Sequence, residues 1–508
     1  MVRTSMVPML LVCCGLAAQV PGTAEVKRLS LQDALRTSLQ NNLQVDIAQQ
    51  ARDTTRAQVL INQGPFDWNL SAEAQVQRLD SASTGSLSKV SGGTYQELAT
   101  TYNRTLTTDL TKAFEWGGSV DLGYAPVYAY SRGVYNDYPS AGTSTAWTTA
   151  RPYSGAFTAT YSQNLLLGFG REVTTAPLVI AQKGVESADY TFRLAIINLM
   201  AATESQYWDV VYAGKNLENY QTALRLAQKQ LADNNIRLKV GTMAPLDVTS
   251  AEAQVAKAEQ DIITGQAALD NAKDTLIRAL YPNAERPAGL ELTDTPPLSY
   301  PSMDEASAVK MALERRVELK SARINKDIND LQLKVARNKL LPSLKASIAY
   351  NGATDSYGSI GSVNSDLTGM NYPGYTVGLA FSMPLQNRAA KGGLAVARAN
   401  LRSSELTLRD QELSITLDVR KAVRNVESME KGVKAAEKTR YLQEKTLEAE
   451  QKKFENGMST NFNVLQDMTN LDNARSAESQ AQINYANAIT ALEQALGNLL
   501  EARNFTIK

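Results

Sequence analysis

The side chains that most often carry out catalysis are scarce in this sequence. The chain contains no histidine, and its two cysteines, Cys13 and Cys14, lie close to the N-terminus. Beyond these positions, the usual pairs of nucleophile and base and the metal sites built from histidine or cysteine cannot form. Catalysis by carboxylates alone remains possible in principle, but the acidic residues lie on predicted helix faces in the mixture expected of solvated surfaces. We therefore predict a protein that is not an enzyme and that uses no metal or cofactor.

Neither a nucleotide nor a nucleic acid is an expected ligand. The segment from Gly168 to Gly170 is too short to be a nucleotide-binding loop, and we interpret it as the junction between a strand and a helix. Lys and Arg together number 52, and so do Asp and Glu. This balance creates no large field of one sign that would attract nucleic acid.

A duplicated segment is the most informative feature of the chain. Residues 238–248, which contain Gly241, return in similar form as residues 454–464, which contain Gly457. Each copy lies between a very long helical pattern and a shorter one. Other similar segments occur in the same order in both halves. The chain therefore encodes two copies of a unit made of helix, strand, strand, long helix, turn and helix.

Long helices flank each of these turns. Residues 170–240 contain no proline after Pro177 and predict one helix of roughly 60 residues, on the order of 90 Å long. Apolar residues recur there in alternating steps of three and four, and the pattern resumes at 248–269 after the turn. The second half repeats this arrangement, with helices predicted at 391–456 and 464–500. The expected result is two antiparallel coiled-coil hairpins.

Many positions in the seams of these helices carry alanine or glycine instead of leucine. Small residues let helices lie close together, and they suit sheet-like packing of many helices. An ordinary long coiled coil would show the same heptads, so the heptads alone do not separate the two arrangements.

Short segments between the helices alternate apolar and polar residues with a period of two. One apolar and one polar face, over about 9 to 11 residues, is typical of a membrane β-barrel with lipid outside and water inside. A water-soluble sandwich would show the same alternation. An export signal and aromatic residues near strand ends, such as Trp68, favour the barrel. The four clear segments are 70–76, 157–161, 344–350 and 375–383.

Long polar stretches follow these strands, at 80–93, 130–152 and 351–374. We expect them to be solvent-exposed loops at the cell exterior. Residues 102–110 and 119–128 predict an additional hairpin. We assign it no role beyond extending the rim of the predicted barrel.

The number of strands predicts an oligomer. Four membrane strands are too few to close a barrel, because known single-chain barrels begin at about eight. Three copies would give about 12 strands, a plausible number for closure.

The N-terminus predicts export from the cytoplasm. Arg3 supplies a positive start, residues 6–18 an apolar stretch, and residues 22–24 a small-residue cleavage site. No later apolar run is long enough to cross a bilayer as a helix. We therefore divide the chain into a signal peptide at 1–24, a first repeat at 25–290 and a second repeat at 291–508.

The sequence resembles the TolC family of bacterial outer-membrane efflux proteins from about Leu29 to Arg503. The segments that carry the resemblance most specifically are the two turns with their flanks and one strand-to-helix step, at 237–248, 453–464 and 381–385. Each segment is weakly diagnostic alone, but together with the duplication they identify the family. The first half follows the motif less closely, because Trp68 stands where the second half has Pro342.

The resemblance implies a fold that is mainly α-helical with a β-barrel portion. Three copies would form a transmembrane barrel of about 12 strands in the outer membrane, continuing into a long α-helical barrel in the periplasm. The implied partners are outer-membrane lipid, a periplasmic membrane fusion (adaptor) protein and, through it, an inner-membrane transporter.

The resemblance also implies that the adaptor docks at the two turns. The residues concerned are Val240, Gly241, Thr242, Gly457, Met458 and Ser459. Each glycine also suits a left-handed helix cap, and the two roles are compatible.

Some members of the family close the tunnel with aspartates just after the second turn. The matching positions here are Asn463 and Gln466, with Asp467 beside them, whereas the first copy keeps an acid at Asp247. A carboxylate ring at the second turn is therefore in doubt for this chain. If Asp247 faces the lumen, three copies would gather negative charge that can bind cations. Alternatively, its side chain is the N-cap of a helix that begins near Val248.

These observations predict a passive exit duct of a tripartite efflux or type I secretion system, leading from the periplasm to the exterior. The energy would come from the inner-membrane partner, and opening would be a rearrangement of the hairpins at the periplasmic end. The alternative is an exported coiled-coil scaffold or adhesin without channel activity. Because a wide water-filled tunnel needs no selective site, the sequence leaves open the substrate, the choice between efflux and secretion, and the identity of the pump.

Overall fold

The computed structural model describes residues 26–86, 94–138, 144–282, 287, 289–297, 299–301 and 303–505. The chain divides into two compact units. Unit 1 contains residues up to Gln49 together with Phe192–Val317 and Glu412–Lys508, and unit 2 contains Gln50–Thr191 and Glu318–Gln411. The predicted signal peptide at 1–24 lies outside the described residues.

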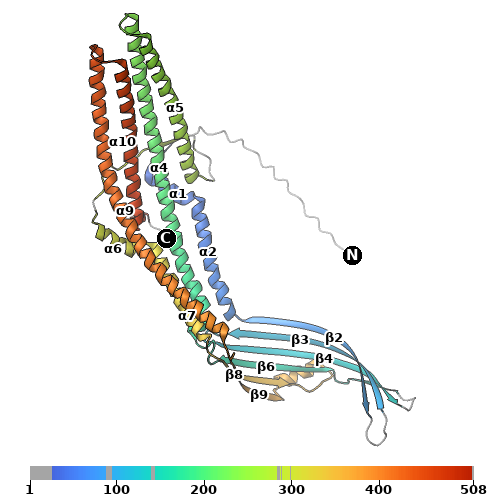
Figure 1. The fold of residues 1–508 in the computed structure, drawn as a ribbon. Coiled ribbons are helices and arrows are strands. Elements are labelled where there is room, and N and C mark those ends of the chain that lie inside the picture. The colour runs from blue at the N-terminus through green and yellow to red at the C-terminus, as the bar shows by residue number, and fades with distance from the viewer. Residues whose placement is uncertain are drawn as a thin grey trace, which may run out of the picture. The chain divides into compact units, whose positions relative to one another are not determined.

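Two helical hairpins dominate unit 1 (Figure 1). In the first, α4 (Ala176–Lys239) is followed by α5 (Pro245–Leu280), and in the second, α9 (Arg388–Glu455) is followed by α10 (Asn461–Leu496). The early parts of α4 and α9 belong to unit 2. The predicted long and short helices are confirmed. Both short helices begin three residues before their predicted starts at residues 248 and 464.

Shorter elements complete unit 1. They are α1 (Leu31–Asn41), α6 (Glu305–Arg315), α11 (Leu499–Ala502), and a parallel pair of strands, β1 (Val26–Leu29) and β7 (Gly289–Leu292). None of the described helices is both long enough and apolar enough to cross a membrane.

Aromatic side chains of α4 form the centre of the core of unit 1. Tyr207 and Trp208 are buried and pack edge to face, with ring centroids 5.2 Å apart. The Tyr207 hydroxyl donates to Leu29 O at 3.1 Å and accepts from Asp294 N at 3.2 Å. These bonds satisfy a buried hydroxyl and fix the strand pair against α4.

Small residues bring α4 and α5 close together, as the sequence predicts. A methyl group at Gly265 of α5 would lie only 2.8 Å from the ring of Tyr220 on α4. Any larger residue at this position would therefore force the two helices apart. Ala251 and Ala258, on the same helix, are also buried.

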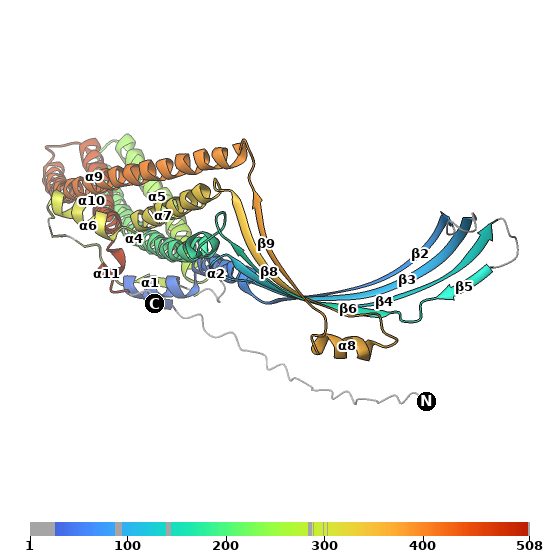
Figure 2. The same ribbon diagram turned by 90° about the horizontal axis from the view of Figure 1, so that it is seen from below.

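An antiparallel sheet dominates unit 2 (Figure 2). Its strands run in the order β2-β3-β4-β6-β8-β9, and β5 (Ser144–Thr148) pairs with β4 off this path. The strands on the path are β2 (Asn69–Ser86), β3 (Thr94–Ala113), β4 (Gly118–Tyr138), β6 (Tyr153–Asn164), β8 (Ser343–Ala353) and β9 (Pro373–Ser382). The helices of this unit include most of α2 (Leu43–Gln63) and α7 (Val317–Asn338), the short α3 (Arg171–Thr174), and α8 (Ile360–Thr368).

The four predicted membrane strands and the additional predicted hairpin together form the six-stranded path of the described sheet, so the hairpin does more than extend the rim. The hairpin predicted at 102–110 and 119–128 becomes β3 and β4, which lie inside the sheet between β2 and β6. The apolar side of β3 is interrupted by threonines such as Thr108, which weakens its alternation. Periodicity alone therefore did not reveal that it is a full member of the sheet.

The predicted loops are also partly wrong. Residues 80–86 belong to β2, residues 130–138 to β4, and residues 360–368 to α8. Toward these ends the otherwise apolar face of β2 and β4 carries the charged residues Asp80 and Arg132. A period-two hydrophobic signal therefore disappears there although the backbone pairing continues.

The sheet has one apolar and one polar face, as predicted. Residues that pair directly across strands share a face, because side chains alternate along each strand. The apolar face is strongly exposed, with Val377 79% accessible. It includes Leu70, Leu110, Leu122, Ala159, Tyr350 and Tyr375, whereas the opposite face includes Glu73, Asp109, Asp121, Thr160, Ser347 and Thr376.

Candidate functional site

The first tip, residues 240–244, joins α4 to α5 and contains a left-handed glycine. Gly241 has a φ of +81°, and its N donates to Leu238 O at 3.0 Å. Thr242 N donates to Arg237 O at 2.9 Å. This pair of bonds is the Schellman arrangement, which satisfies the last carbonyls of a helix. The predicted cap role of Gly241 is therefore confirmed.

The second tip, residues 456–460, joins α9 to α10 with the same geometry. Gly457 has a φ of +73°, and its N donates to Phe454 O at 3.1 Å. Met458 N donates to Lys453 O at 2.8 Å. The duplication seen in the sequence thus extends to individual hydrogen bonds, and Gly457 is a cap as well.

The helices that leave the two tips begin in register with one another. α5 starts after Ala244, and α10 starts after Thr460, whose side-chain oxygen accepts from Asn463 N at 3.4 Å. Asp247 and Asn463 are therefore both third residues of their helices. The N-cap interpretation of Asp247 is wrong, because Ala244 holds that position. Asp247 instead lies in the first turn of α5, where the helix dipole favours a negative charge.

Large apolar side chains are exposed at both tips. Val240 and Met458 are each 72% accessible, Leu246 is 76% accessible and Phe462 is 71% accessible. Exposed apolar groups concentrated at one place are typical of interaction surfaces. Leu246 and Phe462 were not among the predicted site residues. Both are second residues of their helices, α5 and α10. An apolar residue at the same position of both repeats is the sequence signal that could have identified them.

The four candidate gate residues differ in their surroundings. Asp247 and Asp467 are partly buried, whereas Asn463 and Gln466 are exposed. Asn463 Nδ2 donates to Ser459 Oγ at 3.3 Å within its own hairpin. The part of the chain that the structure describes contains no group of three or more acidic, histidine or cysteine side chains that could hold a metal ion. A cation site at Asp247 depends on three copies and stays a prediction.

Three buried amides connect the two hairpins, and we call them the amide cluster: Gln230 and Asn234 on α4, and Asn461 on α10. Asn234 Nδ2 donates to Asn461 Oδ1 at 2.8 Å, and Gln230 Nε2 donates to the same oxygen at 3.2 Å. Asn461 Nδ2 donates to Asp247 O at 3.1 Å. Asp247 is therefore tied to the second hairpin by its backbone carbonyl.

The sequence analysis missed the amide cluster. Polar residues on a long helix are usually solvated, so Gln230 and Asn234 gave no reason to expect burial. Their separation of one helical turn, beside buried Ala227, was the available signal.

Arg237 makes a second connection between the hairpins. Its Nη1 donates to Phe454 O at 3.2 Å, and its guanidinium lies 4.4 Å from the centre of the Phe454 ring. Phe454 itself is buried in an apolar cluster with Val464, Met468 and other residues. The last turn of α4 is thereby joined to the last turn of α9.

Ser459 is held in place by a carboxylate of α9. Its Oγ donates to Glu450 Oε1, and Lys453 Nζ lies 2.9 Å from the other oxygen of that carboxylate. The Ser459 hydroxyl, followed by Lys453, lowers the pKa of Glu450 below its usual value. Ser459 is partly buried, so of the predicted docking residues at the second tip, Met458 presents the larger accessible surface.

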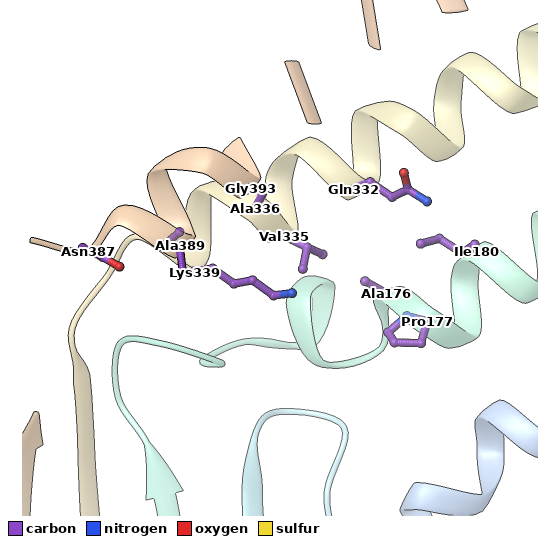
Figure 3. A pocket seen from close by; sticks show the side chains of 11 residues that line it. Ala176, Pro177, Ile180, Gln332, Val335, Ala336, Lys339, Asn387, Ala389 and Gly393 are labelled. Atoms are coloured by element: carbon purple, nitrogen blue, oxygen red, sulfur yellow. The ribbon is translucent and has the colours of Figure 1, made fainter. Parts of the chain in front are cut away.

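A cavity of about 540 Å³ lies in unit 2 among the early turns of α4, the end of α7 and the beginning of α9 (Figure 3). Its walls are mostly small or apolar, including Ala176, Val335 and Gly393, and Lys339 is its one charged lining residue. A lone lysine without an acidic partner in the wall does not form an acid and base pair. The cavity therefore does not indicate catalysis.

The fold and the tips define a protein with two equivalent helical hairpins and a sheet with one apolar face. The chain belongs to the outer membrane efflux protein family, whose match covers residues 134–280 and 308–498. The protein is therefore an outer-membrane efflux protein by family. Strands β2 and β3 and residues 118–133 of β4 lie outside the matched residues, so most of the additional hairpin occurs where the family model does not match this chain.

Curated relatives are similar over part of their length. The outer membrane protein TolC of Vibrio cholerae serotype O1 is 26% identical over 208 residues, which cover 40% of this chain and 46% of that protein. TolC of Escherichia coli strain K12 is 26% identical over 216 residues, which cover 41% of this chain and 42% of that protein. The chain therefore spans less than half the length of the curated relatives it matches.

Solved structures with the same fold are outer-membrane channels. The channel OprN has a TM-score of 0.67 at 14% identity, covering 92% of this chain and 90% of that chain. The Campylobacter jejuni CmeC channel has a TM-score of 0.62 at 15% identity, covering 92% of this chain and 86% of that chain. At these identities the likeness shows the fold.

Proposed function

We propose that this protein is the outer-membrane exit duct of a tripartite efflux or type I secretion system. Two features of the same chain carry the proposal. One is a sheet with an exposed apolar face, and the other is a pair of helical tips that have equivalent caps and exposed apolar side chains. The duct is passive, and an inner-membrane transporter supplies the energy. The scaffold alternative has no support from the family to which the chain belongs.

A homotrimer is the assembly that we propose. Among the described residues, β2 pairs with β3 alone and β9 with β8 alone, so each has one edge without a strand beside it. An open sheet edge in lipid leaves backbone groups without hydrogen bonds, and pairing between copies removes this cost. Three copies of this six-stranded path would give about 18 strands instead of about 12.

The larger strand count has a consequence for the pore. Barrel diameter grows roughly linearly with strand number, and barrels of about 16 to 18 strands leave an aqueous channel. The proposed barrel is therefore wider than the one that the sequence predicts.

We propose that the tips dock a periplasmic adaptor protein. The accessible apolar side chains Val240, Leu246, Met458 and Phe462 support this role, because they offer equivalent contacts on both hairpins. Gly241, Thr242, Gly457 and Ser459 shape the turns that present them.

A gate beside the tips is supported by the contacts that join the hairpins. A cysteine pair replacing Asp247 and Asn461 would link α5 to α10, whose residues meet there through the Asn461 amide. We expect the disulfide to block export and its reduction to restore export. Unchanged export by the oxidised protein would contradict a gate at this position. Asn463, Gln466 and Asp467, which lie two to six residues further along α10, are the candidates for single substitutions.

Two measurements test the exit duct itself. The protein should be extracted from outer membranes by detergent as a trimer, and it should give single-channel currents in a planar lipid bilayer. Release by salt alone, or a bilayer without discrete conductance steps, would contradict the proposal.

A further inference from the structure

The segment between β8 and β9 packs α8 against the apolar face of the sheet (Figure 2). A methyl group at Gly155 of β6 would lie 2.7 Å from Val363 Cγ1 of α8. Gly155 is on the same face as Phe157. Tyr124 pairs with Phe157 across the strands and therefore lies on this face too. The Tyr124 hydroxyl donates to Asn364 Oδ1 of α8 at 2.6 Å. The helix therefore covers part of the surface that membrane lipid is expected to contact.

α8 exposes no charged side chain. Asp366 is its one charged residue, and the carboxylate is buried. It accepts hydrogen bonds from Tyr357 Oη at 2.9 Å and from Asn371 Nδ2. Ile360 and Thr368 are among its exposed residues. No charge on the exposed side of this helix opposes contact with lipid.

A cavity of about 700 Å³ lies between α8 and the sheet. This volume is within the range of about 300 to 1,000 Å³ that is usual for small-ligand sites. The lining is aromatic and aliphatic, with one amide and one hydroxyl side chain at α8. The lining includes Tyr124, Phe157, Tyr350, Asn364, Leu367 and Met370.

The cavity is continuous with the exposed apolar face. The ring of Phe157 lies 6.3 Å from that of Tyr350, and Tyr350 lies 5.6 Å from Tyr375 on β9. Tyr375 and the neighbouring Val377 are among the most accessible apolar residues of the sheet. An apolar chain on this face can thus pass along the aromatic row and under α8 without crossing a charged group.

α8 also lies at a defined end of the sheet. It follows the end of β8 and precedes the start of β9, whereas the opposite ends of β6 and β9 lead toward α3, α4 and α9. If the helices extend into the periplasm, as proposed, α8 is at the outer-leaflet side. Aromatic residues such as Tyr124 and Tyr350 are typical of that interface.

We propose that the cavity under α8 binds the acyl chain of an outer-leaflet membrane lipid. Tyr124, Phe157, Tyr350, Leu367 and Met370 surround the chain. The side-chain oxygen of Asn364 already accepts a hydrogen bond from Tyr124. Its amide nitrogen remains to donate to the ester group of the same lipid. The lipid holds α8 against the sheet and thereby orders the segment that connects β8 to β9.

The full chain can be tested with a mass-labelled lipid. The protein is incorporated into vesicles of phosphatidylcholine with brominated acyl chains, extracted again in mild detergent and weighed by native mass spectrometry. We expect about one retained brominated lipid for each chain. Leu367→Trp, which fills the cavity, should reduce retention at least fivefold. Met370→Ala shortens a lining residue that is 63% accessible, and it should reduce retention severalfold.

Leu379→Trp is the matched control. Leu379 lies on the same apolar face and is 69% accessible, but it does not line the cavity. We expect this variant to retain lipid as the unmodified protein does. Equal loss in Leu379→Trp and Leu367→Trp, or an unmodified protein that carries detergent alone, would overturn the proposal.

The inference rests on the proposed placement of the sheet in the outer membrane, and the two can fail separately. Protein that salt washes from the vesicles would contradict the membrane placement and the lipid site together. Protein that needs detergent for extraction but retains no lipid would contradict only the site under α8.

Discussion

The Arg237 guanidinium lies 4.4 Å from the centre of the Phe454 ring and donates a 3.2 Å hydrogen bond to Phe454 O. The same carbonyl accepts from Gly457 N at 3.1 Å, so both of its lone pairs are used at the end of α9. One side chain of the first hairpin therefore completes the cap of the second. This contact makes the two tips parts of one structure, although they belong to different copies of the repeat.

Replacing Arg237 by alanine should destabilise the helical unit. The change removes a hydrogen bond from a charged donor and a cation–π contact, which together are worth about 2 to 3 kcal/mol. Thermal unfolding followed by circular dichroism in detergent measures the effect. Arg225→Ala is the control, because Arg225 is an exposed residue of the same helix whose guanidinium donates to Thr222 Oγ1, three residues earlier in α4. Equal destabilisation by both changes would show that the Arg237 contact is not specific.

The amide cluster should give strongly non-additive effects. Asn461→Leu leaves the buried amides of Gln230 and Asn234 without their shared acceptor, at a cost of about 1 to 3 kcal/mol. Asn234→Leu has a similar cost. The double variant should be less destabilised than the sum of the two, because two apolar side chains then face each other. A double-mutant cycle in thermal or denaturant unfolding tests this, and additive values would contradict a coupled cluster.

The features that could be predicted from the sequence are those with a strong local signal. Gly241 and Gly457 need a positive φ, and the turn chemistry around them predicted the caps correctly. Leu344–Tyr350 alternates cleanly because one side of β8 is apolar and the other polar. The long helices follow from seams with a regular period. Each of these elements is encoded within a few turns or one strand.

The missed features depend on distant partners. β3 carries threonine at Thr108 where a clear strand would carry a large apolar residue, and it is stabilised by pairing with β2 and β4 on both sides. α8 is held by Gly155 and Tyr124, which are far away in the sequence. Asn461 is buried because α4 brings two amides to it. Local propensity does not contain this information.

The stability of the helical unit should depend on pH through Asp472 on α10. Burial raises the pKa of its carboxyl to about 6, against the opposing effects of Arg475 and Lys257 and with a smaller contribution from Asp261. The folded state therefore binds the proton more tightly than the unfolded state. This stabilising contribution is complete below a pH of about 4 and is lost as the pH rises through about 6.

Asp472→Asn should remove this dependence. The variant should be more stable than the unmodified protein by about 1 kcal/mol at pH 7.5, less than the full shift would give because the side chain is partly solvated. At pH 4 the two proteins should unfold at nearly the same temperature. Asp274→Asn, at an exposed position on α5, is the control and should change little at either pH. A parallel offset at both pH values would contradict the assignment to Asp472.

The two tip glycines offer a way to separate a structural role from a docking role. No atom lies within 4 Å of a methyl group placed on Gly241 or Gly457, so the cost of a substitution comes from the left-handed backbone alone. Alanine at either position should destabilise the helical unit by about 1 to 2 kcal/mol, and asparagine by less, because asparagine tolerates this conformation. Gly432→Ala is the matched control. That glycine lies inside α9 with equally open surroundings, and alanine there should stabilise by about 0.5 to 1 kcal/mol.

The asparagine variants then test docking, because they keep the caps. If Gly241→Asn and Gly457→Asn unfold at nearly the original temperature but export falls several-fold in cells, the turn surface itself contacts the partner. If export follows thermal stability across the alanine and asparagine series, the glycines act as caps only. The docking contacts then lie in the accessible side chains beside them, and Leu246→Ser and Phe462→Ser should reduce export without lowering stability.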